Sequence, residues 1–210
     1  MKLALLGGSF NPVHNGHLLL ALQAANEYGY ERVLFIPAKD PPHKFIASGA
    51  REEDRWAMLN AALDEFNDAR FIADDCELRR EGVSYTIDTV RALERRYKMR
   101  PGEKLGLIIG SDLCADFGKW KEPELLAEKT DIVLGRRPLS CGSTADSCSV
   151  GEFYNAGETF PWSHLKLHNE FYAVSSAAIR RIISEKEDWK SLVPSSVYRY
   201  IVERKLYGFN

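Results

Sequence analysis

Short apolar runs alternate with helical segments along most of this 210-residue chain, and this alternation restricts the fold more than any other feature. The apolar runs predict buried strands over residues 2–6, 32–36, 70–73, 105–109 and 132–134. Apolar side chains at helical spacing predict helices over residues 18–25, 52–66, 86–97 and 124–128. Repeated alternation of this kind is typical of a parallel sheet whose crossover helices cover both faces. We therefore expect an α/β fold, a doubly wound, Rossmann-like parallel sheet.

The chain after the last predicted strand has two parts of different character. Residues 138–163 are rich in Ser, Thr and Gly, which predicts a loop insertion. Residues 175–206 predict two helices divided near Pro194. We therefore expect an α/β domain over residues 1–172 and a small C-terminal helical lobe over residues 173–210. The ligand site should lie beyond the carboxyl ends of the strands, as it does in open parallel sheets.

Charge and hydropathy argue against several classes of protein. The 28 Lys and Arg residues against 30 Asp and Glu give a net charge of −2, which offers no basic field for nucleic acid. No apolar run approaches the roughly 18 residues of a membrane span. Residues 1–6 are too short an apolar stretch for a signal peptide, and Gly7 and Gly8 end it. We expect a cytoplasmic protein with no nucleic-acid or membrane partner, and leave open whether it forms a homo-oligomer.

The cysteines do not form a recognisable metal or disulfide framework. They stand at positions 76, 114, 141 and 148, with no CxxC pair, and favour reduced thiols in a chain without a secretory signal. The alternative is a zinc site of Cys141, Cys148, His164 and His168, because the spacing of the two histidines suits zinc. The six residues between the two cysteines exceed the usual spacing, however. We therefore favour free thiols and expect no metal ligands.

The first predicted strand runs into the sequence GGSFNPVHNGH over residues 7–17, which we call the first turn. It has neither the GxxxxGK[ST] of a P-loop nor the GxGxxG of a dinucleotide-binding fold. A glycine-rich turn between a strand and a helix nevertheless offers backbone N–H groups and a helix N-terminus, both of which favour anions. The first turn is therefore a candidate anion site.

His14 and His17 lie three residues apart within the first turn. Near the start of a helix, this spacing places both imidazoles on one side, and Gly16 lets a phosphate approach the backbone. Imidazoles that face an anion donate hydrogen bonds to it, and a phosphate favours their protonated form. Capping or core histidines are the structural alternative. A metal pair fits less well, because no third ligand is nearby.

The first turn resembles the first signature of the nucleotidyltransferase superfamily, whose glycine-rich turn and HxGH motif bind ATP. Residues 174–180, VSSAAIR, resemble its second signature, a phosphate clamp. Ala177 stands where the superfamily commonly has Thr, so one hydroxyl contact is absent. Ser176 and Arg180 are four residues apart and would share one helix face, where a hydroxyl and a forked guanidinium suit a triphosphate. Alone, this segment would indicate an N-capped surface helix; together, the two motifs favour the clamp.

Within this superfamily, the chain is most similar to the bacterial nicotinate mononucleotide adenylyltransferases. The shared features are PPHK at 41–44, SYT at 84–86 before Asp88 and Thr89, GSD at 110–112 with Trp120 beyond it, Arg137-Pro138, and LVP at 192–194 followed by Val197, Tyr200-Ile201 and Leu206-Tyr207. The resemblance covers about residues 1–137 and 172–208 and leaves the insertion without a counterpart. It makes the α/β domain a nucleotide-binding domain.

The resemblance implies an enzyme that condenses ATP with nicotinate mononucleotide to nicotinate adenine dinucleotide and pyrophosphate, with magnesium bound through the ATP phosphates. It assigns catalysis to His14, His17, Lys44 and Arg180. It assigns ATP binding to Gly7, Gly8, Ser9, Phe10, Gly16, Gly110, Asp112, Arg137, Ser175, Ser176 and Ile179. It assigns mononucleotide binding to Asn11, His43, Tyr85, Thr86 and Trp120.

Several of these side chains have physical reasons for their roles. Trp120 offers a flat face to a cationic pyridinium ring, with a half-buried core tryptophan as the alternative. Thr86 would offer a hydroxyl and a helix N-terminal N–H to a carboxylate, or act as a plain N-cap. His43 and Lys44 follow two prolines that keep their loop extended, and would reach phosphates or stay solvated.

Two alternatives remain open. The same fold would also serve another phosphorylated acceptor, namely nicotinamide mononucleotide, phosphopantetheine or glycerol phosphate; the PPHK and SYT segments argue against the last two. A site built for a carboxylate should reject the amide, because its donors would go unpaired. The other alternative is a nucleotide-sensing protein that binds ATP without turnover, and the presence of both histidines and Arg180 argues against it.

Overall fold

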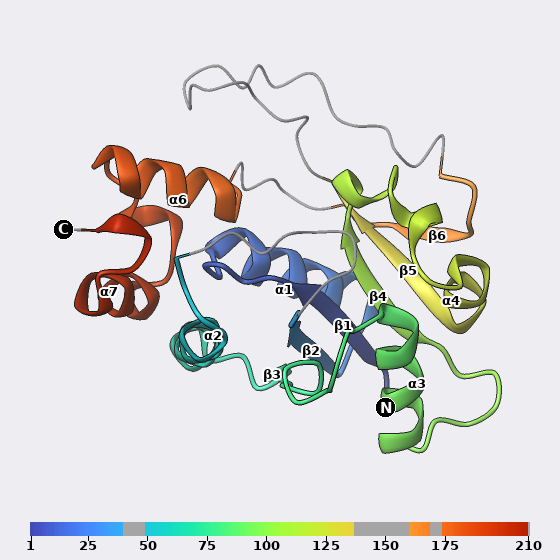
Figure 1. Cartoon of the computed structure of the whole chain (residues 1–210). Helices are drawn as coiled ribbons and strands as arrows, with labels where there is room; N and C mark the ends of the chain where they lie inside the picture. Colours follow the sequence, from blue (N-terminus) through green and yellow to red (C-terminus); the bar gives the residue numbers. More distant parts are fainter. Residues whose placement is uncertain (40–48, 137–159, 169–173, 210) are drawn as a thin grey trace.

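The computed structural model describes residues 1–39, 49–136, 160–168 and 174–209. Within these residues, parallel strands form one sheet in the order β3-β2-β1-β4-β5-β6 (Figure 1). The strands are β1 Leu3–Gly8, β2 Arg32–Pro37, β3 Phe71–Ala73, β4 Leu105–Gly110, β5 Thr130–Gly135 and β6 His164–Lys166. The helices are α1 Asn15–Tyr28, α2 Glu52–Phe66, α3 Thr86–Arg96, α4 Pro123–Lys129, α6 Ser176–Glu185 and α7 Ser195–Arg204. The expected α/β fold is confirmed.

The order of the strands reverses at β1. This strand pairs with β2 on one side and with β4 on the other, so Leu5 lies opposite Leu34 and Leu107. In a doubly wound sheet, ligands bind beyond the carboxyl ends of the strands at this switch point. The glycines that end β1 and β4 therefore border the crevice where the sequence predicts the site.

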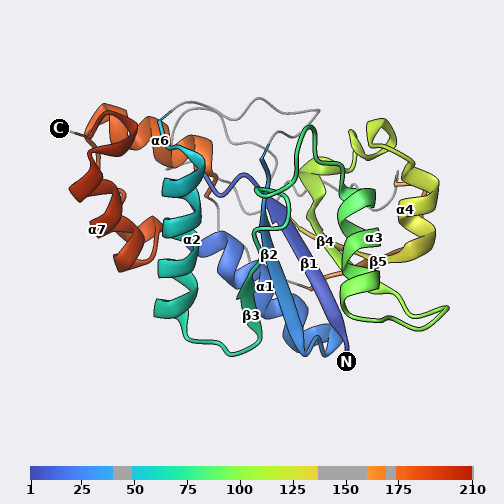
Figure 2. The same ribbon diagram turned by 60° about the horizontal axis from the view of Figure 1, so that its bottom comes forward.

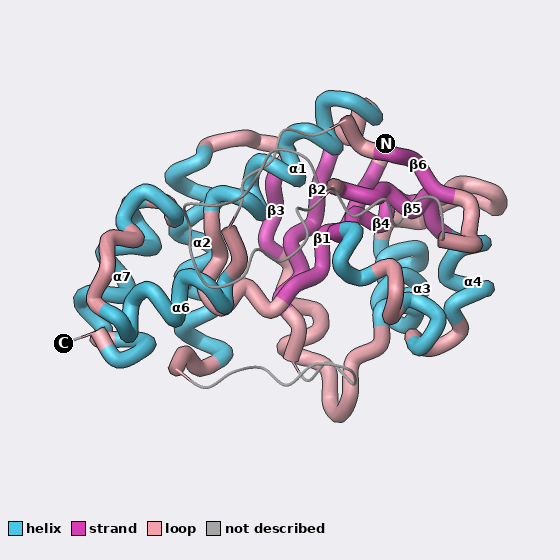
Figure 3. The backbone as a smooth tube through the Cα atoms, turned by 90° about the horizontal axis from the view of Figure 1, so that it is seen from above, coloured by secondary structure: helices cyan, strands magenta, loops and turns pink. Residues whose placement is uncertain are grey.

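Helices cover both faces of the sheet, and adjacent residues of β1 show how the faces are divided. Leu3 and Leu5 belong to a buried apolar cluster with side chains of α3 and α4, whereas Ala4 and Leu6 belong to a second cluster with α1, α2, α6 and α7. The helices of the two clusters lie on different sides of the sheet (Figures 2 and 3). Successive side chains of a strand point to opposite faces, so a continuous apolar run is needed to supply both clusters.

Helix ends follow local capping chemistry. Helix α1 begins before the predicted start at residue 18, because His14 takes an extended N-cap conformation and its N–H bonds to the side chain of His17. It ends at Gly29, which has the left-handed φ of 68° that glycine adopts at little cost. Helix α2 ends at Asn67 in a similar conformation, with φ of 55°.

The C-terminal segment forms α6 and α7, divided near Pro194 as predicted. Helix α7 packs against α2, and Glu65 of α2 accepts hydrogen bonds from the N–H groups of Ser195 and Ser196 at 3.0 and 2.6 Å. Both C-terminal helices join the buried cluster of α1 and α2. This lobe therefore adds to the core on one face of the sheet.

Two features of the middle of the chain differ from expectation. Strand β6 was not predicted, because its sequence HLK forms no apolar run and lies largely exposed at the edge of the sheet. Phe160 is buried, so the predicted loop over 138–163 includes residues that pack in the core; residues 137–159 lie outside the described part. No helix in the described ranges has the length and apolar character of a membrane span.

Candidate active site

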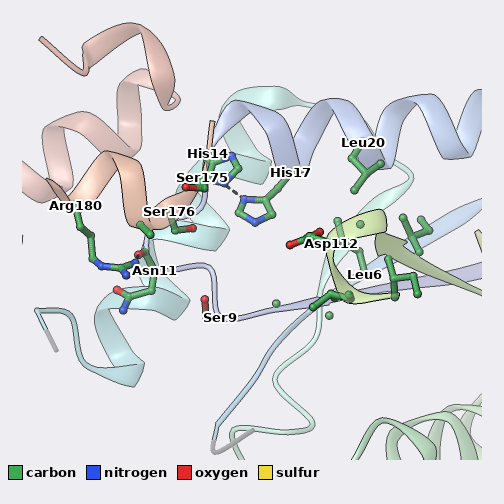
Figure 4. Close-up of a pocket in the computed structure, with 17 residues that line it drawn as sticks. Leu6, Ser9, Asn11, His14, His17, Leu20, Asp112, Ser175, Ser176 and Arg180 are labelled. Atoms are coloured by element: carbon green, nitrogen blue, oxygen red, sulfur yellow. Dashed lines mark hydrogen bonds between the residues drawn. The ribbon is translucent and has the colours of Figure 1, made fainter. Parts of the chain in front are cut away.

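A cavity of about 240 Å³ opens at the carboxyl ends of β1 and β4, at the predicted switch point. Three segments enclose it: the first turn, the residues that follow β4, and the start of α6 (Figure 4). Its lining consists of Leu6, Gly7, Gly8, Ser9, Asn11, His14, His17, Leu20, Ile108, Ile109, Gly110, Asp112, Leu113, Ser175, Ser176, Ala177 and Arg180. The two predicted signatures, from opposite ends of the chain, thus lie on one cavity.

His14 and His17 lie side by side at the start of α1. Their ring centroids are 3.7 Å apart with 32° between the planes, as expected for rings on one side of the helix. The backbone N–H of His14 donates to Nδ1 of His17 across 3.2 Å (Figure 4). A neutral imidazole that accepts at Nδ1 carries its proton on Nε2, so His17 presents an N–H donor at the other side of its ring.

The backbone around the two histidines is closely packed. A Cβ at Gly16 would lie 3.1 Å from the ring of His14 and 3.3 Å from the side chain of Val174, so a larger residue would push α1 away from the chain that leads into α6. Phe10 is fully buried and meets His17 edge-on, with centroids 5.0 Å apart. Phe10 therefore supports His17 from behind, and neither Phe10 nor Gly16 lines the cavity.

The start of α6 is attached to the first turn by side-chain hydrogen bonds. Ser176 Oγ donates to the carbonyl of Pro12 at 2.9 Å, and Arg180 Nη1 donates to the carbonyl of Asn11 at 2.6 Å. The two side chains are one helical turn apart and reach neighbouring peptides, which is the shared face that their spacing predicted. The second signature thus holds the first signature in place as well as lining the cavity.

The other residues of the second signature have more local positions. Ser175 caps α6, its Oγ accepting the N–H of Ala178 at 3.1 Å. Ala177 lines the cavity, so the place of the absent hydroxyl is on its wall. Ile179 is fully buried in the core and does not line the cavity, although the resemblance assigned it to ATP binding.

Arg55 of α2 is a residue that the sequence analysis missed. Its side chain is 1% exposed, and Nη1 donates to the carbonyls of Ser9 at 2.7 Å and Ala38 at 2.9 Å. It thereby joins the turn after β1 to the turn after β2. The signal was present in the periodicity, because Arg55 stands one helical turn before the buried Leu59.

The cavity favours negatively charged ligands. Arg180 and the two histidines face it, and the N-termini of α1 and α6, which carry the positive ends of the helix dipoles, border it. Among the described residues of the lining, Asp112 supplies the carboxylate, and it lies on the β4 side near His17 (Figure 4). A group of cationic and N–H donors with one carboxylate near them suits an anionic ligand that also carries hydroxyl groups.

A second polar region, which we call the α3–α4 region, comprises Tyr85–Asp88 and Phe117–Glu122. Tyr85 is the N-cap of α3 and Thr86 its first residue. Lys121 stands 4.6 Å above the ring of Tyr85 and 3.0 Å from Oδ2 of Asp88. Lys121 therefore connects two segments. One segment contains Tyr85 and Thr86, and the other contains Trp120, so these three of the residues assigned to mononucleotide binding lie in adjacent segments.

A cluster of aromatic side chains packs against the α3–α4 region. Phe117 lies 5.1 Å from Trp120, 5.2 Å from Phe160 and 4.9 Å from Trp162, centroid to centroid. Phe160 and Trp162 were missed because they fall in the predicted loop, where the closely spaced aromatics were the available signal. They fix the position of Trp120 indirectly, through Phe117.

A polar network fixes the chain before Tyr85. Thr89 Oγ1 donates to Glu77 Oε1 at 2.6 Å, while Arg80 Nη1 donates to the hydroxyls of Thr89 at 3.0 Å and Ser84 at 3.2 Å. Burial raises the pKa of Glu77, and the contacts with Thr89 and Arg80 reverse this only in part. The network joins the loop after β3 to the N-terminal end of helix α3.

Three of the predicted site residues, His43, Lys44 and Arg137, are outside the described residues. Asn11, assigned to the mononucleotide, lines the cavity beside the histidines instead of joining the α3–α4 region.

The residues of the zinc alternative are only partly described. Cys141 and Cys148 lie outside the described ranges. His164 Nδ1 lies 2.8 Å from the carbonyl of Trp162, and His168 Nδ1 lies 2.7 Å from Glu27 Oε1, so the two rings make separate contacts. In the described part of the chain, no three His, Cys, Asp or Glu side chains are placed to hold a metal ion.

Comparisons with known proteins agree with this geometry. The profile of the cytidylyltransferase-like family matches residues 5–182. A protein of Treponema pallidum (strain Nichols), named probable nicotinate-nucleotide adenylyltransferase, is 37% identical over 207 residues, which are 99% of each chain. One of the same name from Geobacter metallireducens is 35% identical over 218 aligned positions, covering 99% of this chain and 98% of the relative. The Plasmodium falciparum nicotinic acid mononucleotide adenylyltransferase complexed with NaAD has the same fold, with a TM-score of 0.74 at 19% identity over 100% of this chain and 98% of that one.

Proposed function

The chain belongs to the cytidylyltransferase-like family, and because it matches nicotinate-nucleotide adenylyltransferases along its whole length, we propose that its cavity is where ATP meets nicotinate mononucleotide. The reaction condenses the two into nicotinate adenine dinucleotide and pyrophosphate, a step of NAD biosynthesis. The observation that carries the site assignment is that both signatures line one cavity, with the two histidine rings side by side at its wall.

The chemistry asks little of the protein beyond alignment and charge stabilisation. The nucleophile is a phosphate oxygen of the mononucleotide, already mostly dianionic at neutral pH because its second pKa is about 6. It attacks the α-phosphorus of ATP in line. A new P–O bond forms while the bond to the bridging oxygen of the β-phosphate breaks, and pyrophosphate leaves with that electron pair. No general base and no covalent intermediate are needed.

The residues of the cavity supply the donors that this charge movement requires. We assign the Nε2–H of His17 and the imidazole of His14 to the phosphate oxygens, where negative charge grows in the transition state. From α6, the remaining N–H groups of Arg180 and the hydroxyl of Ser175 would donate to the triphosphate, while Ser176, whose hydroxyl donates to the carbonyl of Pro12, would hold the first turn beside it. Asp112, on the opposite wall, would accept hydrogen bonds from ribose hydroxyls.

We propose that magnesium reaches the site on the ATP phosphates. This ion usually keeps several waters and uses one or two carboxylates together with substrate phosphates. Asp112 is the carboxylate among the described lining residues, which fits a substrate-borne ion better than a cage made by the protein. When bound, the ion would offset charge on the triphosphate; the roles given to the side chains do not pass through it.

We assign binding of the acceptor, nicotinate mononucleotide, to the α3–α4 region. We assign the carboxylate of nicotinate to the hydroxyl and N–H of Thr86 at the start of α3, and the pyridinium ring to the faces of Tyr85 and Trp120. What supports this is the approach of the two segments through Lys121. A pocket that donates hydrogen bonds to a carboxylate loses them with an amide, so the acid should be preferred.

The test is pyrophosphate release with ATP and magnesium, offering nicotinate mononucleotide and nicotinamide mononucleotide in parallel. We expect strong preference for the acid. Equal use of both would keep the reaction and reject the assignment of Thr86. No release with either substrate would reject the proposed use of the cavity.

A further inference from the structure

The last turn of the chain contacts the first turn, although no role follows for it from the reaction. Residues Leu206–Gly208 form a short 3-10 turn that packs against α6 and α7. Tyr207 within it is 8% exposed, and its hydroxyl donates to Oδ1 of Asn11 at 2.7 Å, across 196 positions of sequence. The end of the chain thus touches a residue that lines the cavity.

Three attachments meet at Asn11 and Pro12, two of them on Asn11 itself. Its side chain accepts from Tyr207, and its carbonyl accepts from Arg180. The neighbouring carbonyl of Pro12 accepts from Ser176. Asn11 itself is 1% exposed, so a shift of its side chain cannot be absorbed by solvent. Any such shift would move the peptide on which Arg180 is held.

The position of Tyr207 is itself closely specified. Its backbone lies in the left-handed region, at φ 59° and ψ 25°, which is uncommon for a residue with a Cβ and persists where the surroundings over-determine it. Gly49 lies against the ring, and a Cβ there would come within 2.8 Å of Tyr207 Cδ1. The side chain of Tyr207 is thus held in place at the cost of an unfavourable backbone conformation, and the contact with Gly49 leaves no room for a larger residue there.

The hydroxyl of Tyr207 is well suited to act as a constant donor. Burial raises the pKa of Tyr207 far above its ordinary value, and the nearby guanidinium groups of Arg180 and Arg55 lower it only in part, while Asp54 raises it further. The phenol therefore stays protonated across the pH range in which the enzyme would work.

We propose that Tyr207 is a positioning residue for adenylyl transfer: through Asn11 it fixes the first turn, and with it the placement of Arg180 and the histidine pair around the phosphates. This rests on the proposed function of the cavity. A misplacement of about 1 Å costs orders of magnitude in rate when reacting groups must be aligned. The hydroxyl, and not merely the ring, is the group that matters.

The test compares Tyr207→Phe with Tyr200→Phe, in the wild-type background and in Asn11→Ala. Tyr200 is a matched control, because its hydroxyl also joins the C-terminal lobe to α2, at Asp54 Oδ1 across 3.1 Å, without contacting a residue of the cavity. Pyrophosphate release gives kcat and both KM values for each protein, and urea denaturation gives the fraction folded under assay conditions.

We expect Tyr207→Phe to lower kcat about 10-fold per folded molecule while the KM for nicotinate mononucleotide stays within about twofold. Tyr200→Phe should keep the wild-type kcat. In Asn11→Ala, which should itself be slow, adding Tyr207→Phe should change nothing further, because the two act as one unit. Wild-type kcat in Tyr207→Phe, or effects that multiply in the double variant, would overturn the inference while leaving the proposed function intact. A wild-type protein that releases no pyrophosphate would instead reject both.

Discussion

The first turn and the α3–α4 region both follow strand ends at the same edge of the sheet, yet different kinds of contact hold them. Around the first turn, the buried Arg55 of α2 and the half-buried Arg180 of α6 reach backbone carbonyls, and Arg55 and Asn11 are each 1% exposed. The α3–α4 region is joined at its surface by ion pairs. The side chains of Lys121 and Asp88 are 40% and 32% exposed.

This difference assigns separate tasks to the two regions. Buried charge-assisted hydrogen bonds are poorly screened by salt and fix geometry closely. Exposed ion pairs contribute about 0–1 kcal/mol each and weaken as salt rises. We therefore expect changes around the first turn to lower kcat or stability, and changes in the α3–α4 region to alter the KM for the mononucleotide.

The largest effect should come from His17→Ala. It removes an N–H donor from the region where charge grows, so kcat for pyrophosphate release should fall by at least about 100-fold. The free energy of unfolding should fall by about 1 kcal/mol, because the buried N–H of His14 loses its acceptor, so kcat is compared per folded molecule. His168→Ala is the control, because its ring is exposed and pairs with Glu27 away from the cavity. Wild-type turnover in His17→Ala would remove this residue from the mechanism.

Arg55→Met should show that the first turn depends on support from α2. Two carbonyls lose a buried donor, so the free energy of unfolding should fall by about 2–4 kcal/mol, and kcat by about 10-fold. Urea denaturation and pyrophosphate release measure the two effects. Arg51→Met, on a side chain 73% exposed just before the same helix that pairs with Asp54, should cost at most about 1 kcal/mol and leave kcat unchanged. Equal behaviour of the two variants would contradict a special role for Arg55.

Lys121→Met should have a smaller effect than Arg55→Met, and it should act on KM instead of on kcat or stability. The KM for nicotinate mononucleotide should rise about 2–5-fold, as expected for an exposed charge, with kcat within about twofold. High salt should reduce the difference in KM between the variant and the wild type. Lys119→Met is the control, since Lys119 contacts Asp116 and is 70% exposed. A fall in kcat as large as that of His17→Ala would erase the distinction between the two regions.

The smallest effect, a change in stability, should come from Glu77→Gln in the polar network that contacts Thr89 of α3. Because burial raises the pKa of Glu77 in the folded state, the unfolded chain releases this proton first as pH rises, and wild-type stability is lost from the unfolded pKa up through the folded one. Glutamine avoids that loss. The variant should be more stable than wild type at pH 7, and the difference should disappear near pH 4, below the unfolded pKa. Urea titrations at the two pH values measure this; the opposite trend would show that the charge is stabilising.

Local chemistry made much of this molecule predictable. The apolar runs gave the strands because both faces of the sheet are covered, and residues 7–17 gave the turn because glycines and a helix start are adjacent in sequence. His14 and His17 could be placed together from their spacing alone. Ser176 and Arg180 could likewise be placed on one face of α6.

Long-range contacts were not predictable in the same way. Nothing in the sequence near Tyr207 indicates that its hydroxyl meets Asn11, since 196 positions separate them. Arg55 was passed over because hydrophobic periodicity treats a charged residue as a surface residue, whereas here backbone carbonyls satisfy it in the core. Strand β6 was missed because its sequence HLK forms no apolar run. All three omissions concern contacts that only the folded chain brings together.

The most direct test of the account is to follow the α-phosphate of ATP. With α-labelled ATP, magnesium and nicotinate mononucleotide, the label should move into nicotinate adenine dinucleotide, with one pyrophosphate released per dinucleotide formed, and His17→Ala should slow both equally. Label that remains in ATP, or that is released as AMP without forming the dinucleotide, would contradict in-line transfer between the two nucleotides in this cavity.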